Sequence, residues 1–132
     1  MNDLSKLLGQ PFGSADAQAF VKTLRGLAEV ESDTDGTIYS YPAAGVSVSV
    51  TPNTGRIFMV VFYGPGAKRF SAYGNPLPEG LAFAMTRPEV EKLVGPADVS
   101  KGDEQAWKRA TYRLGIRYLK TGRIRRVTIW GA

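Results

Sequence analysis

The chain has 132 residues, of which 43% are hydrophobic and 22% are charged, and its formal net charge is +5. This length and composition are typical of a globular domain with an apolar core. The sequence contains no cysteine and no histidine. Their absence excludes disulfides, Ser-His-Asp and Cys-His catalysis, and the nitrogen and sulfur ligands of zinc sites. We therefore expect no cofactor, no metal site and no catalytic residues, and a protein that is not an enzyme.

The sequence also gives no indication of a membrane partner. No window approaches the roughly 18 apolar residues that a membrane helix needs. The N-terminal residues contain an early acid, Asp3, and lack the long apolar run of a signal peptide. The sequence thus predicts a cytoplasmic protein.

The first half of the chain is predicted to form a helix followed by strands. Ser14 precedes a segment with apolar residues at three- and four-residue spacing, which predicts an amphipathic helix that ends at Gly26. Its apolar face would carry Ala17, Phe20, Val21, Leu24 and Leu27. The acidic residues 29–36 are predicted to form a solvated loop. Alternation and apolar content predict strands at residues 37–41, 46–50, 56–63 and 68–73.

The second half shows the same order. Residues 74–80 are rich in Gly and Pro and are predicted to link the halves. Thr86 and Glu89 have the spacing of a capping box, which predicts a helix that ends at Gly95-Pro96. A polar loop is predicted at residues 97–105. Strands are expected at residues 107–112, 116–120 and 123–130.

An internal duplication underlies this similarity. The stretch Thr54-Gly-Arg-Ile returns as Thr121-Gly-Arg-Ile, 67 positions later, and both copies end in an aromatic residue and a glycine. Gly45-Val46 also matches Gly115-Ile116, at an offset of 70. The sequence predicts one α+β domain of two pseudo-repeats, about 1–73 and 81–132, with the linker at 74–80. Each repeat would be a helix followed by a three- to four-stranded antiparallel meander, and the helices would cover one face of the sheet.

Several residues of the second unit carry a resemblance to a known group of folds. They are the helix end Leu93-Val-Gly-Pro96 and the residues Trp107, Tyr112, Gly115 and Gly122. Residues 86–130, and more loosely 16–63, resemble the repeat of the β-lactamase-inhibitor protein and of the outer-membrane-assembly lipoprotein BamE. The tandem arrangement is more similar to that of the inhibitor protein. The resemblance implies a non-enzymatic module that presents a sheet surface to another protein.

Alternation along the strands predicts which side chains share a face. The helix-covered face would carry Val46, Val48, Val50, Phe58, Val60 and Phe62 from the first half, and Ile116, Tyr118, Val127 and Ile129 from the second. The opposite face would show Met59 and Thr128 together with the predicted partner-binding residues Ser47, Ser49, Tyr63, Arg117, Arg126 and Trp130. Tyr, Trp and Arg are enriched at interface hot spots. Alternatively, Tyr63 and Trp130 complete the core at the strand ends.

Charge is distributed unevenly along the chain. Residues 1–55 contain six acids and three bases, whereas residues 107–132 contain eight bases and no acid. Either this asymmetry steers an anionic partner to one end, or the two halves neutralise each other across their strands. The sequence predicts an immunity or inhibitor-type protein that occludes a protein partner with an acidic surface. The alternative is nucleic-acid binding by the basic strands at 107–126, through Arg113, Arg117, Arg123, Arg125 and Arg126.

Overall fold

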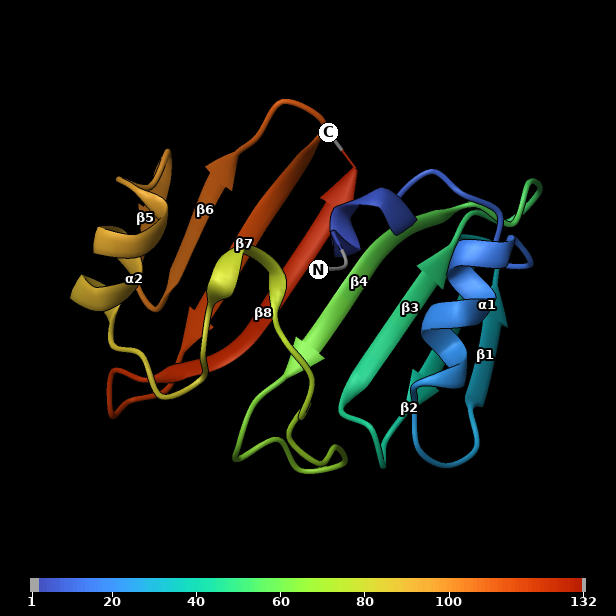
Figure 1. Ribbon diagram of the computed structural model, residues 1–132, viewed down its shortest axis with the longest axis horizontal. Coiled ribbons are helices and arrows are strands. Elements are labelled where there is room, and N and C mark those ends of the chain that lie inside the picture. Colours follow the sequence, from blue (N-terminus) through green and yellow to red (C-terminus); the bar gives the residue numbers. More distant parts are fainter. Residues whose placement is uncertain (1–2, 132) are drawn as a thin grey trace.

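The computed structural model describes residues 3–131, so the first two residues and the last residue of the predicted repeats lie outside it. Eight antiparallel strands form one sheet in the order β1-β2-β3-β4-β8-β7-β6-β5 (Figure 1). The strands of the first half are β1 (Glu29–Asp33), β2 (Gly36–Tyr41), β3 (Val46–Val50) and β4 (Ile57–Tyr63). Those of the second half are β5 (Val99–Lys101), β6 (Glu104–Lys108), β7 (Tyr112–Tyr118) and β8 (Ile124–Gly131). The predicted α+β class, with an antiparallel sheet, agrees with this architecture.

Two α-helices and two 3-10 helices lie on one side of the sheet (Figure 1). They are η1 (Leu4–Leu7), α1 (Ala15–Lys22), η2 (Pro78–Gly80) and α2 (Arg87–Val94). Ala17 of α1 and Val90 of α2 are fully buried in the same core cluster as the inward side chains of the strands. No helix among residues 3–131 is long and apolar enough to cross a membrane.

The two α-helices begin where the sequence predicts. The Ser14 hydroxyl accepts a hydrogen bond from the Ala17 backbone N–H at 3.2 Å. Glu89 accepts one from the Thr86 backbone N–H at 3.0 Å, as a capping box requires. The end predicted for the first helix is wrong, because α1 stops at Lys22 and leaves Leu27 91% exposed.

The predicted loops contain the two edge strands. Residues 29–33 form β1 and residues 99–101 form β5, although every residue in both strands is exposed. Each pairs with a neighbour on one side only and buries no side chain, so it lacks the apolar alternation by which inner strands are recognised. Conversely, residues 68–73 form no strand, and a turn of 3-10 helix occupies the end of the predicted linker.

A β-bulge corrects one predicted core position. Val50 pairs with Ile57, while Ser49 pairs with Met59, so Phe58 is an extra residue in β4. Ile57 is therefore buried at 3% exposure, and Phe58 is 38% exposed. The remaining residues predicted for the helix-covered face are buried, including all three valines of β3.

The second half has a bulge at the corresponding place. Tyr118 pairs with Ile124 and Arg117 pairs with Arg126, so Arg125 is the extra residue, 67 positions after Phe58. The register also corrects one detail of the predicted duplication. Val60 lies opposite Val48, and Val127 lies opposite Ile116. Ile116 thus corresponds to Val48, and the predicted match of Gly45-Val46 with Gly115-Ile116 is displaced by two residues.

The repeated Thr-Gly-Arg-Ile stretch has one structural role in both halves. Its arginine follows the turn and donates a hydrogen bond to a backbone carbonyl of the segment that precedes the helix. Arg56 bonds the Gly9 oxygen at 2.8 Å, and Arg123 bonds the Ala84 oxygen. Isolated β-bridges join Pro11 to Arg56 and Thr86 to Arg123. Each arginine therefore ties the start of a helix to the sheet.

Candidate functional site

The sheet face opposite the helices, which we call the open face, is the most distinctive surface of the protein. Its centre is the pair Val61 and Thr128, which lie opposite each other on the central strands β4 and β8. On one side of this pair Met59 lies opposite Trp130, and on the other Tyr63 lies opposite Arg126. Met59 and Arg126, which differ by 67 positions, thus lie at symmetric places about the centre, as do Tyr63 and Trp130.

The register places all six predicted partner-binding residues on the open face and brings only some of them next to each other, since Arg126 lies opposite both Tyr63 and Arg117. Arg117, Arg126 and Trp130 lie on β7 and β8, whereas Ser47 and Ser49 lie on β3. The two serines are only 5% and 8% exposed. Both are small residues and present little surface to a partner.

Tyr63 is partly covered by the chain itself. The Phe70 ring stacks on the Tyr63 ring with centroids 3.8 Å apart and planes inclined by 11°. The Tyr63 hydroxyl lies 3.4 Å from the Ser47 hydroxyl. Close by, Arg69 forms an ion pair with Glu29 at the edge of the sheet. The segment after β4 therefore occupies part of the open face in the first half.

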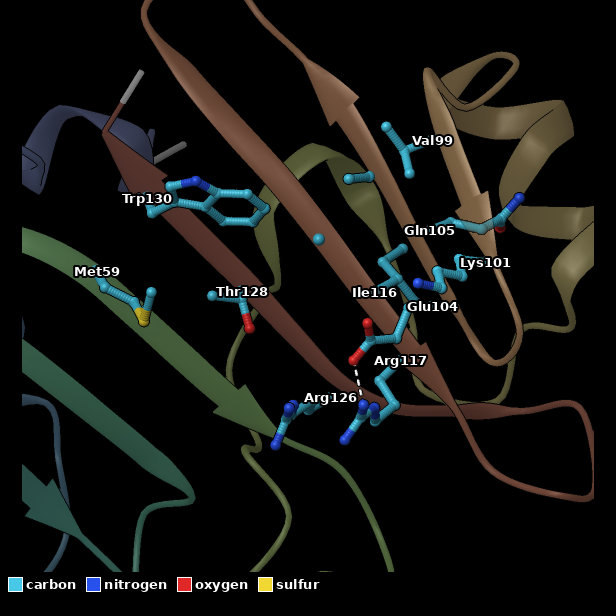
Figure 2. A pocket seen from close by; sticks show the side chains of 12 residues that line it. Met59, Val99, Lys101, Glu104, Gln105, Ile116, Arg117, Arg126, Thr128 and Trp130 are labelled. Atoms are coloured by element: carbon cyan, nitrogen blue, oxygen red, sulfur yellow. Dashed lines mark hydrogen bonds and ion pairs between the residues drawn. The ribbon is translucent and has the colours of Figure 1, made fainter.

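The second half contains a hollow of about 300 Å³ on the same face (Figure 2). Side chains and backbone from β4 to β8 line it. The lining residues are Met59, Val99, Lys101, Glu104, Gln105, Ala106, Gly115, Ile116, Arg117, Arg126, Thr128 and Trp130.

The hollow exists because small residues form its floor. Ala106, Gly115 and Thr128 lie side by side on β6, β7 and β8. The Trp130 ring lies over Gly115 so closely that a Cβ at residue 115 would be 2.7 Å from the ring atom Cζ3. Glycine at this position thus leaves the indole room to lie against the sheet. Sequence reasoning placed Trp130 in the site, but it named Gly115 only for the resemblance and the duplication and did not name Ala106. The role of these two small residues depends on contacts between strands.

Cationic side chains gather at the other end of the hollow. Arg117 and Arg126 lie directly opposite each other on β7 and β8, an arrangement of like charges that is unfavourable by itself. Arg117 is compensated by an ion pair with Glu104. Among residues 3–131, neither the Arg126 side chain nor the Lys101 side chain has an ion-pair partner or a hydrogen bond. The end of the hollow marked by Arg126 in Figure 2 is therefore positively charged.

The residues predicted for nucleic-acid binding divide between two roles. Arg113, Arg117 and Arg126 lie on the open face. Arg123 is bonded to the Ala84 carbonyl, and Arg125 is the exposed bulge residue. The five arginines therefore do not form one continuous stripe.

The sheet order separates the charges that are uneven in the sequence. Three strands, β2 to β4, lie between the acidic strand β1 and the arginine-bearing strand β8. The acids of β1 consequently do not neutralise the arginines of β7 and β8 across neighbouring strands. Within residues 3–131 no group of three or more acidic side chains is arranged to hold a metal ion.

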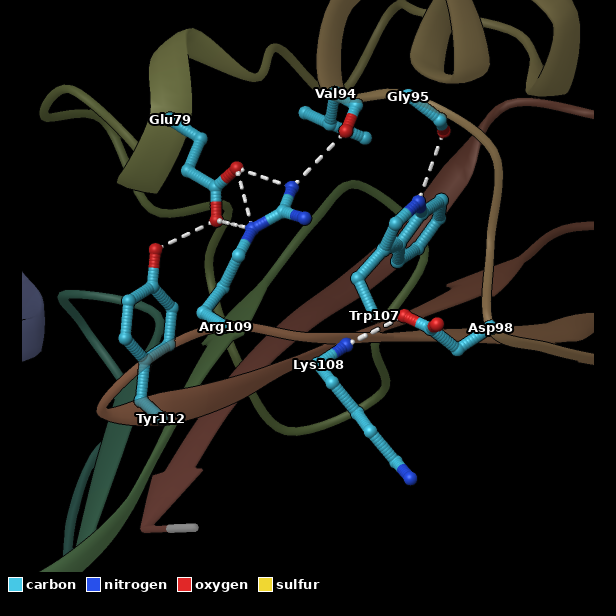
Figure 3. Close-up of polar contacts among 8 residues, drawn as sticks. All are labelled: Glu79, Val94, Gly95, Asp98, Trp107, Lys108, Arg109 and Tyr112. Atoms are coloured by element: carbon cyan, nitrogen blue, oxygen red, sulfur yellow. Dashed lines mark hydrogen bonds and ion pairs between the residues drawn. The ribbon is translucent and has the colours of Figure 1, made fainter.

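A second polar cluster lies on the helix-covered side (Figure 3). Glu79 accepts hydrogen bonds from Arg109 Nη2 at 2.6 Å, from Arg109 Nε at 3.0 Å and from the Tyr112 hydroxyl at 2.6 Å. Burial raises the pKa of Glu79, but the bonds from Arg109 and Tyr112 outweigh burial and hold its pKa below the usual value. Burial, followed by the bond to Glu79, raises the pKa of Tyr112 to about 12.

This cluster fastens the linker between the halves to the turn after β6. Arg109 also donates to the Val94 carbonyl at 3.0 Å, and Trp107 donates to the Gly95 carbonyl at 2.9 Å. Glu79, Arg109 and Trp107 thus hold η2, the β6–β7 turn and the end of α2 together. Because each group is engaged within the fold, the cluster is a structural element rather than a reactive site.

In comparisons with known proteins, no family model, no curated protein and no solved structure matches this chain significantly. The resemblance to the inhibitor repeat therefore rests on the sequence residues alone, and the function has to be argued from the geometry of the open face.

Proposed function

We propose that the protein is a non-enzymatic protein-binding module of the immunity or inhibitor type, which acts in the cytoplasm by covering a functional surface of its partner. The observation that carries this proposal is the hollow of the open face, with the Trp130 ring at one end and Arg126 at the other (Figure 2). Large aromatics and arginines beside a concavity are the usual anchors of a protein interface. Neither histidine nor cysteine is present to support the commonest nucleophilic mechanisms.

We further propose that the two halves are pseudo-repeats, about 1–73 and 81–132, each a helix followed by an antiparallel meander. The equivalent bulges at Phe58 and Arg125 support this interpretation, as do the arginine bonds from the two Thr-Gly-Arg-Ile turns. The repeats would have diverged in function. In the first the open face is partly covered by Phe70, and in the second it is left hollow.

The charge of the hollow points to the chemistry of the partner. Arg126 and Lys101 have no acidic partner among the described residues, so an acidic protein surface would supply the missing counter-charges. Such complementarity accelerates association, and added salt should slow it.

Site-specific photo-crosslinking in cells that naturally produce the protein tests this function. A photoreactive amino acid at Thr128, in the centre of the open face, should form an adduct with a specific protein. The same group at Leu93, which is 47% exposed on α2, is the control for the helix side. Adducts only at the control position, or none at Thr128, would contradict the proposed function.

Nucleic-acid binding is the second candidate, because Arg113, Arg117 and Arg126 lie on one face together with Lys101 and Lys108. Phosphate contacts are strongest at low ionic strength. A titration with single-stranded and duplex DNA and RNA at low salt should therefore show binding if this candidate is right. Absence of binding there would eliminate it.

A further inference from the structure

The two halves of the open face place an aromatic side chain in the same way. In the first half Tyr63, at the end of β4, reaches Ser47 on the neighbouring strand. In the second half Trp130, 67 positions later on β8, lies over Gly115 on its neighbour. Ser47 and Gly115 occupy corresponding places, because they lie opposite the two members of the central pair of the face.

In the first half this place is filled by two adjacent residues of the chain itself. The Phe70 ring stacks on Tyr63 with centroids 3.8 Å apart. Its neighbour Arg69 pairs with Glu29 on the edge strand β1. The first half thus shows what this arrangement of strands accepts, namely an aromatic side chain beside a charged one that finds an opposite charge on the sheet.

In the second half the corresponding place is open. No aromatic ring among residues 3–131 stacks on Trp130, and the floor beside it consists of Gly115 and Ala106. The hollow of about 300 Å³ is at the lower end of the size range of ligand pockets, so it suits a side chain better than a large ligand.

The charge at the edge of the second half is reversed. Through the strand register, Val99 on β5 holds the place of Glu29, which binds Arg69 in the first half, and Lys101 holds the place of Glu31. Arg126 adds a second cation in the same row across the strands, with Glu104 and Arg117 between it and Lys101. Because Arg126 and Lys101 have no ion-pair partner among residues 3–131, the charged side chain that fits this end of the hollow is an acid, whereas in the first half it is the base Arg69.

We propose that the hollow binds an aromatic side chain flanked by Asp or Glu, presented by the partner protein. The aromatic ring would stack on the Trp130 indole above the floor of small residues, and the carboxylate would pair with Arg126, while Lys101 adds positive charge in the same row of the sheet. Offset stacking and a charge-assisted hydrogen bond would act together. This inference rests on the proposed function and identifies the segment by which the partner is recognised.

Selection from a displayed library of random 12-residue peptides tests the inference directly. With the full chain as bait, the enriched peptides should carry Phe, Tyr or Trp next to Asp or Glu. Arg126→Glu should weaken their binding at least tenfold and shift the selected neighbours of the aromatic residue from acids to bases. Arg125→Glu is the matched control, since it makes the same charge change at an exposed residue that does not line the hollow, and it should leave binding unchanged.

The two tryptophans provide an independent readout. Binding of a selected peptide should shift the NMR signal of the Trp130 indole N–H. It should leave that of Trp107, which is buried and bonded to the Gly95 carbonyl, in place. Circular dichroism of each variant shows whether the fold is retained.

The inference is overturned if no peptide is enriched, if the enriched peptides lack the aromatic–acid pair, or if both charge variants behave alike. It also fails if the Trp130 signal does not move. These outcomes differ from failure of the proposed function. If a crosslinked protein partner binds the Arg126→Glu variant as well as the natural chain, the function stands and the recognition segment is wrong. If peptides bind but no cellular protein crosslinks at Thr128, the proposed recognition segment stands and the proposed function is wrong.

Discussion

Glu79 is the only non-glycine residue among residues 3–131 with a positive φ, at 58°. A left-handed backbone costs an ordinary residue about 1–2 kcal/mol, so surrounding contacts have to maintain it. The bonds from Arg109 and Tyr112 to the carboxylate supply those contacts (Figure 3). At the scale of a single residue, the left-handed backbone conformation of the linker at Glu79 is thus maintained by the contacts of one carboxylate.

Replacing this carboxylate should destabilise the protein in a pH-dependent way. Because Glu79→Gln keeps the backbone conformation but leaves Arg109 without its anion, we expect a loss of about 2 kcal/mol in the free energy of unfolding at neutral pH. The folded state lowers the pKa of Glu79. The stabilisation is therefore present above the unfolded-state pKa and is lost as the pH falls through the folded-state pKa. Urea titrations between pH 7 and pH 3 should show the two proteins converging, and a constant difference would contradict this account.

At high pH two tyrosines should have the opposite effect on stability, because the stabilisation they contribute is lost as the pH rises. Burial is the largest cause that raises the pKa of Tyr112 and of Tyr118, in each case to about 12. A raised pKa stabilises the folded protein below the unfolded-state value of about 10, and this stabilisation is lost as the pH rises towards 12. Tyr118→Phe should therefore flatten the decline in stability between pH 10 and pH 12, measured by urea unfolding.

Tyr39→Phe is the control, because Tyr39 is a tyrosine of the first half whose ring stacks on Phe12 and whose hydroxyl has no hydrogen bond among the described residues. An equal effect of both substitutions would show that the buried Tyr118 is not responsible. The Tyr118 hydroxyl donates to Gln105 at 2.7 Å, so its removal also lowers stability at neutral pH, and only the slope with pH decides the prediction.

At the scale of the elements, the two Thr-Gly-Arg-Ile turns attach the sheet to the segments that precede the helices. Arg56→Ala and Arg123→Ala each remove a bond from the sheet to the segment before a helix. We expect each to lower the free energy of unfolding by about 1 kcal/mol, and to increase hydrogen exchange in the adjoining helix only. Arg125→Ala, two positions after Arg123, should change neither quantity. Equal exchange throughout the molecule would show that the arginines do not act locally.

The elements that sequence reasoning predicted well are those whose pattern is local. The Val46–Val50 run alternates with a period of two, and Thr86 and Glu89 form their capping box within one helical turn. The edge strands β1 and β5 could not be recognised, because every one of their side chains is exposed and only pairing with a neighbour makes them strands. The exposure of Phe58 depends likewise on the register with β3.

The candidate site was likewise predictable only where it depends on a local sequence pattern. Alternation correctly placed Trp130 and Arg126 on the face without helices. The hollow itself was not predictable, because it results from Gly115 lying under an indole that comes from the next strand. Ser47 and Ser49 share that face but are almost fully buried, which alternation cannot show.

At the scale of the whole molecule, pairing of their last strands joins the two halves into one sheet. β4 and β8 are the central pair of the sheet, and their inward residues Val60, Phe62, Val127 and Ile129 are fully buried. A unit of about 60 residues is marginally stable, and an exposed edge strand of this kind favours pairing with another strand. Each half therefore needs the other, or a substitute, to complete the sheet.

Cutting the chain between Gly74 and Asn75 tests this dependence. Because the β4–β8 pairing is symmetric about Val61 and Thr128, the edge of one half can also pair with a second copy of itself. We expect either half alone to unfold or self-associate, and the two mixed at equal concentration to form a stable 1:1 complex in light scattering.

A Val60→Asp half should fail to form this complex, because it buries a charge between the halves, whereas Phe58→Asp, at the exposed bulge, should still form it. If either half alone is folded and monomeric, the pairing of β4 with β8 is not required for each half to fold, and the prediction is contradicted.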